Sequence, residues 1–132
     1  MLDLILCVDD DPITLMLCKK VIVKASFSET ILTAKNGEEA LEYFNSILCK
    51  EHENKLPQLI FLDLNMPVMD GWEFLDNFSL KKYSAVNSIK IVVLSSTIDP
   101  EDLEKCKKYP MVIDFLSKPI TTNMLSYLEA RL

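Results

Sequence analysis

The sequence predicts an α/β domain, a doubly wound five-stranded parallel sheet with five helices packed on its two faces in three α/β/α layers. Two observations lead to this fold class. Five short apolar runs rich in Ile, Leu and Val recur along the chain, and segments with helical spacing separate them. The runs are mostly continuous rather than alternating, which is typical of strands covered on both faces. A length of 132 residues fits one domain, which we expect to span residues 1–132.

Each expected strand is too short and too evenly apolar for an amphipathic helix. Residues with high strand propensity fill these runs, and the intervals between them leave room for a helix and its turns. The expected strands are Leu4 to Val8, Thr30 to Ala34, Leu59 to Leu62, Ile89 to Leu94, and Met111 to Leu116.

Helical spacing and start signals occupy the intervals between these strands. Apolar residues recur three and four positions apart in residues 13–21, 40–48 and 124–128. Capping residues, two of them followed by proline, mark where helices begin. The start signals are Asp11-Pro12, the capping-box pair Asn36 and Glu39, Asp70-Gly71, and Asp99-Pro100.

Composition excludes several classes of protein. A net charge of -6 and a pI near 4.8 disfavour nucleic-acid binding, which usually needs a basic face. The four cysteines form no CxxC pair and the chain has one histidine, His52, so we expect reduced, packed thiols rather than a zinc site. Neither a signal peptide nor an apolar run long enough to span a bilayer is recognisable, so we expect a cytoplasmic protein with no membrane association.

Polar residues follow four of the five expected strands. They are Asp9-Asp10-Asp11, then Asp63, then Ser95-Ser96-Thr97, and finally Ser117-Lys118-Pro119. In the flavodoxin-like strand order 2-1-3-4-5, the strands that carry them are neighbours, and ligands bind outside the carboxyl ends of such strands. We therefore expect one functional rim that contains three carboxylates, a hydroxyl and an ammonium group.

The chemistry of this rim points to a magnesium ion and a phosphoryl group. Asp9, Asp10 and Asp63 would repel one another unless a cation lies among them. Oxygen ligands without histidine or thiolate favour a hard ion, and Mg²⁺ commonly binds through one or two carboxylates and a phosphate. A carboxylate neutralised in this way can attack a phosphoryl group and form an acyl phosphate. The Ser95 hydroxyl and the Lys118 amine could then bind the phosphoryl oxygens.

Four segments together resemble the receiver domain of two-component response regulators. They are "LILCVDDDP", "LIFLDLNMPVMDGWEFL", "IVVLSSTIDPED" and "FLSKPI", in the order and spacing of that family and over essentially the whole chain. The resemblance is to stand-alone, chemotaxis-regulator-like members. It implies a phosphorylation switch in a phosphorelay rather than a metabolic enzyme.

The resemblance also implies roles for individual residues. Asp63 would be the phosphoacceptor and would take its phosphoryl group from a sensor histidine kinase or a histidine phosphotransfer protein. Asp10 would bind Mg²⁺ directly, Asp9 would act mainly through water, and Asn65 would offer its backbone carbonyl to the metal. Asp11 precedes Pro12 and is interpreted as a helix cap.

A second group of residues would transmit the signal in this family. Lys118 would pair with the phosphoryl group, and the Lys118-Pro119 peptide would be cis. Ser95 would be the switch hydroxyl, and Phe115 would be the switch aromatic whose rotamer follows the hydroxyl. Threonine and tyrosine are commoner than serine and phenylalanine at these two positions, so a readout through a tyrosine hydroxyl is not expected here.

Two other functions are compatible with parts of this pattern. Haloacid-dehalogenase-type phosphatases also use an aspartyl nucleophile and Mg²⁺, but they have a second aspartate where this chain has Asn65. A binding module that keeps the fold without phosphorylation would be expected to lose the pocket. We expect a monomer that signals to an unknown protein target, and the sequence leaves open a dimer linked to phosphorylation.

Overall fold

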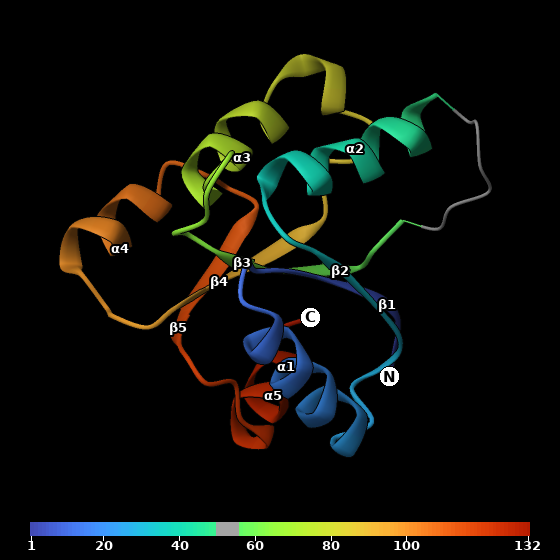
Figure 1. Ribbon diagram of the computed structural model, residues 1–132, viewed down its shortest axis with the longest axis vertical. Helices are drawn as coiled ribbons and strands as arrows, with labels where there is room; N and C mark the ends of the chain where they lie inside the picture. Colours follow the sequence, from blue (N-terminus) through green and yellow to red (C-terminus); the bar gives the residue numbers. More distant parts are fainter. Residues whose placement is uncertain (50–55) are drawn as a thin grey trace.

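A computed structural model describes residues 1–49 and 56–132 (Figure 1). His52, expected to be a solvated surface histidine, lies outside the described residues. Strands and helices alternate along the chain, as predicted. The elements are β1 Leu2–Val8, α1 Pro12–Lys24, β2 Ser28–Ala34, α2 Gly37–Leu48, β3 Leu59–Asp63, α3 Gly71–Phe78, a 3₁₀ turn at Lys81–Tyr83, β4 Lys90–Ser95, α4 Pro100–Cys106, β5 Val112–Ser117 and α5 Thr122–Glu129.

The five strands form one parallel sheet in the order β2-β1-β3-β4-β5. This confirms the predicted fold class and strand order. Helices α1 and α5 lie on one face of the sheet, and α2, α3 and α4 lie on the other (Figure 1). The carboxyl ends of β1, β3, β4 and β5 therefore come together along one rim.

Alternate residues of the central strands bury themselves in two different apolar clusters. Leu6 and Val8 of β1 pack with the aromatic side chains of α2 and α3, whereas Ile5 and Cys7 pack with α1 and α5. Every residue of β3 is buried. Continuous apolar runs are thus required because each face of the sheet has its own layer of helices.

The capping signals are confirmed with one change. Asp11 and Asp99 cap α1 and α4 through their side chains, and each precedes a proline at the start of the helix. Asn36 accepts the amide N–H of Glu39, but the Glu39 carboxylate accepts the N–H of Lys35, so the reciprocal half of a capping box is absent. A complete capping box is formed by Asp70 and Glu73.

Two sequence-based expectations need correction. Strands β1 and β2 begin two residues earlier than predicted because Leu2 pairs with Ser28, although polar residues interrupt the apolar runs there. Cys49 is exposed just after α2, so it is not a packed thiol, whereas the other three cysteines are buried and all four are free. Within the described ranges, no helix is both long and apolar enough to cross a membrane.

Candidate functional site

Three aspartates meet at the carboxyl ends of β1 and β3. Asp9 and Asp10 follow β1, and Asp63 is the last residue of β3. Carboxylate oxygens of all three lie within 4.8 Å of one another. Asp9 and Asp63 are buried at 5% and 7% exposure, whereas Asp10 is exposed. The predicted acidic rim is therefore present, and two of its three members are largely withdrawn from water.

Lys118 brings a positive charge to this acidic cluster. Its Nζ lies 2.6 Å from Asp9 Oδ2 and 3.2 Å from Asp63 Oδ1. The Lys118 backbone N–H donates to the carbonyl of Ser95 at 2.8 Å, and the following peptide bond to Pro119 is cis, as the resemblance implies. The other Asp9 oxygen accepts the N–H of Asp11 at 3.0 Å. Both oxygens of Asp9 are therefore engaged by the protein.

Burial and charge shift the pKa values at this cluster. Burial raises the pKa of Asp63, and the charge of Asp9 raises it further against the opposing effect of Lys118. Burial alone would lower the pKa of Lys118, but its hydrogen bond to Asp9 and the charges of Asp63 and Asp9 raise it overall. Lys118 therefore holds its proton more firmly than a free lysine, and Asp63 releases its proton less readily than a free aspartate.

The donor set fits a hard divalent cation. Asp9, Asp10 and Asp63 supply only oxygen atoms, and their three negative charges are offset by the single positive charge of Lys118. A divalent ion would complete the balance and would stabilise Asp63 as an anion. Asn65, two residues beyond Asp63, is exposed.

The loop after β3 is packed closely against the end of that strand. The N–H of Gly71 donates to the carbonyl of Leu64 at 2.9 Å. A Cβ atom at Gly71 would lie 2.5 Å from the backbone oxygen of Asp63, so only glycine fits this approach. Within the same loop Val68 has a φ of 70°, an unusual conformation for a β-branched residue.

Comparison with known proteins supplies the family. The family model described as the response regulator receiver domain matches residues 5–128. This chain belongs to the response regulator receiver family. Two proteins illustrate the similarity of this receiver domain to others, and in a third the similar region is part of a longer protein.

A two-component response regulator from Cytophaga hutchinsonii superposes with a TM-score of 0.88 and 30% identity, and the match covers 98% of this chain and 96% of the other. The chemotaxis protein CheY of Bacillus subtilis is 30% identical over 115 residues, which is 87% of this receiver domain and 84% of that protein. A protein-glutamate methylesterase/protein-glutamine glutaminase from Methanococcoides burtonii is 30% identical over 128 residues, yet the matched region spans only 33% of its length. Receiver domains are thus found alone and within larger proteins.

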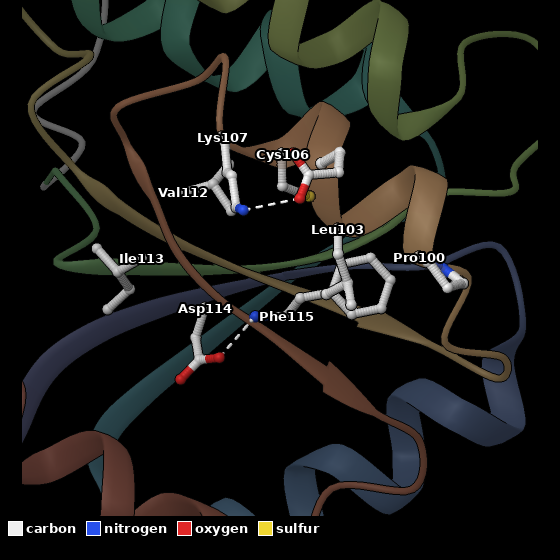
Figure 2. A pocket seen from close by; sticks show the side chains of 9 residues that line it. Pro100, Leu103, Cys106, Lys107, Val112, Ile113, Asp114 and Phe115 are labelled. Atoms are coloured by element: carbon white, nitrogen blue, oxygen red, sulfur yellow. Dashed lines mark hydrogen bonds and ion pairs between the residues drawn. The ribbon is translucent and has the colours of Figure 1, made fainter.

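The expected switch residues occupy the neighbouring strands of the receiver domain. Ser95 ends β4 at 2% exposure, and its hydroxyl accepts the N–H of Thr97 at 3.3 Å. Phe115 lies on β5 opposite Val93 and packs with Leu64 and Cys106. It also lines a groove of about 440 Å³ between α4 and β5 (Figure 2).

Two features of the site were missed from the sequence. One is the preference of Lys118 for Asp9 over Asp63, and the other is the support that the backbone of Asp11 gives to Asp9. Lys118 and Asp9 are separated by 109 positions, so no local pattern indicates which aspartate the lysine contacts. The run of three successive aspartates was the available signal that the backbone of one could hydrogen-bond to the carboxylate of another.

Proposed function

We propose that this receiver domain accepts a phosphoryl group on Asp63 from a sensor histidine kinase or a histidine phosphotransfer protein, in a reaction that depends on Mg²⁺. The observation that carries the proposal is the buried pair of Asp9 and Asp63 bridged by Lys118. Such an arrangement keeps a carboxylate nucleophile at the rim beside a cation. Membership of the family supports the same function.

In the proposed reaction, a carboxylate oxygen of Asp63 attacks the phosphorus of a phosphohistidine. The bond between phosphorus and the imidazole nitrogen breaks, and its electron pair stays on that nitrogen, leaving an acyl phosphate on Asp63. Lys118 would bind one phosphoryl oxygen, as a charge-assisted hydrogen bond requires. Asp9, Asp10, Asp63 and the carbonyl of Asn65 would hold Mg²⁺, which offsets the charge of the carboxylates and phosphoryl oxygens when bound.

Phosphorylation would change the protein surface through Ser95 and Phe115. The Ser95 hydroxyl now accepts from the N–H of Thr97, and we propose that it turns to donate to a phosphoryl oxygen. Phe115, which lines the groove between α4 and β5, would follow this movement (Figure 2). The output would be a changed binding surface for a protein target, with neither nucleic acid nor membrane as the partner.

An apolar surface beside the rim supports docking of a phosphodonor protein. Ile13 and Leu17 of α1 are 62% and 45% exposed, and both belong to the first turns of the helix that follows the acid pair. A hollow of about 550 Å³ next to them is lined by Leu17, Val21, Pro119 and Ile120, among others. A donor that covers these side chains would bring its phosphohistidine close to Asp63.

The proposed role is a switch rather than a turnover enzyme. Asn65 stands where the haloacid-dehalogenase-type phosphatases have their acid/base aspartate, so slow loss of the phosphoryl group to water is the expected end of each cycle. Free cysteines fit a reducing compartment, and we place the protein in the cytoplasm as a monomer when unphosphorylated. Formation of a dimer on phosphorylation is an alternative output to the binding of a different protein target.

The proposal is tested with acetyl phosphate and Mg²⁺, followed by intact mass measurement. We expect a phosphoryl adduct of roughly 80 Da on the wild-type chain and none on the Asp63→Asn variant. Omission of Mg²⁺ or removal of the amine in Lys118→Met should lower the yield at least about tenfold. The absence of an adduct with acetyl phosphate and with a phosphorylated transfer protein would contradict the proposal, and multiple turnover of a phosphate ester would favour a phosphatase.

A further inference from the structure

Four side chains join α3 to the end of α4 on the side of the domain away from α1. The Lys105 ammonium lies 4.4 Å from the centre of the Trp72 ring, a cation–π contact. The Trp72 and Tyr109 rings are 6.0 Å apart, tilted by 32°, and the Tyr109 hydroxyl donates to Asp76 Oδ1. We call Trp72, Asp76, Lys105 and Tyr109 the α3–α4 clamp.

Helix α4 is short and largely exposed. It is seven residues long, and Cys106 is its only buried residue. Leu103, on the side of α4 that faces β5, is still 36% exposed because the groove of about 440 Å³ separates it from full contact with the strand (Figure 2). The clamp therefore adds a connection from the C-terminal end of α4 to α3, beside the packing of Cys106.

The clamp is connected to the proposed phosphorylation site by two routes. Trp72 packs against the small apolar cluster of Leu64, Val93, Cys106 and Phe115, and Leu64 directly follows Asp63 in the chain. The second route is the backbone, since only residues 96–99 separate Ser95 from the start of α4. A movement of Ser95 toward Asp63 would therefore pull on one end of α4 while the clamp holds the other.

We propose that the α3–α4 clamp is a brake on phosphorylation: it stabilises the resting position of α4, and loosening it raises the affinity of the Asp63 site for a phosphoryl group. The inference rests on the proposed function. In the present structure the clamp coexists with a Ser95 hydroxyl that accepts from Thr97 and does not contact Asp63. A contact made only in the resting state must weaken any ligand that requires the other state, by the free energy of that contact.

The protonation state of the clamp suits this role. Burial and the adjacent Asp76 carboxylate raise the pKa of Tyr109 to about 12, so its hydroxyl remains a donor at neutral pH. The Lys105 Nζ lies over the indole face of Trp72. The clamp is therefore closed under ordinary conditions without any ligand or modification.

The test is a titration with beryllofluoride, a phosphoryl mimic, in the presence of Mg²⁺. The chain has a single tryptophan, Trp72, so its fluorescence reports the clamp directly. We expect Lys105→Met and Tyr109→Phe to bind beryllofluoride about two- to tenfold more tightly than wild type. Lys107→Met is the matched control because Lys107 lies at the same end of α4 and pairs with Glu104 of its own helix instead of α3.

A second readout is independent of indole emission. The rise in melting temperature caused by beryllofluoride should be larger in both clamp variants than in wild type and unchanged in Lys107→Met, provided that each unliganded variant melts cooperatively. If the wild-type protein binds beryllofluoride and both clamp variants bind it equally or less tightly, the brake is overturned and the proposed function stands. Failure of the wild-type protein to bind beryllofluoride would overturn the proposed function and the brake with it.

Discussion

Replacing Gly71 with alanine should damage both stability and phosphoryl acceptance. Gly71 begins α3, and its backbone dihedrals are not in the left-handed region, so the need for glycine is one of space. The added Cβ would lie 2.5 Å from the Asp63 carbonyl oxygen and 2.9 Å from Leu64 Cα, whereas real contacts stay above 3.0 Å. Both obstacles are backbone atoms, one in the last residue of β3 and one in the residue that follows it, and the closer one must move by roughly half an ångström to admit a methyl group.

The size of the effect follows from this overpacking. Extra methyl groups in a close-packed interior cost about 1–3 kcal/mol, and the favourable helix propensity of alanine returns only part of this. At about 4 °C for each kcal/mol in a domain of this size, the melting temperature should fall by roughly 4–12 °C. Because the displaced atoms include the backbone of Asp63, the rate of phosphorylation by acetyl phosphate should fall about tenfold.

Gly37 offers a control of the same kind within the same chain. A Cβ there would meet Met69 Cγ and Phe74 Cβ at 2.9 Å. The Met69 side chain can turn aside, but Phe74 Cβ is attached directly to the backbone of α3, so this site is also overpacked, without any contact to the backbone of Asp63. We expect Gly37→Ala to cost about 1–3 kcal/mol, as Gly71→Ala does, and to leave phosphorylation within about twofold of wild type. Urea unfolding and adduct formation measure both quantities. A Gly71→Ala variant that is phosphorylated normally, or a Gly37→Ala variant that loses phosphorylation as strongly as Gly71→Ala, would refute the argument that close packing at Gly71 positions Asp63.

Three further outcomes are expected. Val68→Gly should raise the free energy of unfolding, measured in urea titrations, by about 0.5–1 kcal/mol. Glycine adopts the φ of 70° without strain, and this gain outweighs the greater freedom of glycine in the unfolded chain. A loss of stability would contradict this. The pKa of Tyr109 is raised from its ordinary value of 10.0 to about 12. The protonated phenol therefore contributes fully to the free energy of unfolding below pH 10.0, and this contribution is lost as the pH rises through about 12. Absorbance titration against Tyr109→Phe should show that late-titrating phenol. Arg131→Met removes the ion pair with Asp114 and should cost about 0.5–1 kcal/mol without affecting acetyl phosphate labelling.

Most of the fold could be predicted because it depends on signals that are local in the sequence. Apolar runs marked the strands, and residues such as Asp11 and Asp99 marked where helices begin. Strand boundaries were less accurate, since Leu2 and Ser28 are held in the sheet by pairing with each other rather than by their own propensities. The left-handed backbone of Val68 had no signal at all, because a β-branched residue is a poor indicator of that conformation.

The sequence predicted which residues lie together at the site, but it did not predict which of their atoms are in contact. Strand ends placed Asp9, Asp63 and Lys118 on one rim because parallel strands share a direction. The clamp could not have been found this way, since Tyr109 and Asp76 are 33 positions apart and lie on elements whose relative placement depends on packing.

The charge balance at the rim explains why one lysine contacts two aspartates. The Lys118 ammonium lies closer to Asp9 than to Asp63, at 2.6 Å against 3.2 Å, and Asp9 has no other charged partner among the described residues. A phosphoryl group on Asp63 would add negative charge on that side and draw the ammonium toward it. Asp9 would then need another cation, which the metal supplies in the proposed state. Metal binding and phosphoryl acceptance should therefore reinforce each other, because each removes the charge imbalance that the other leaves.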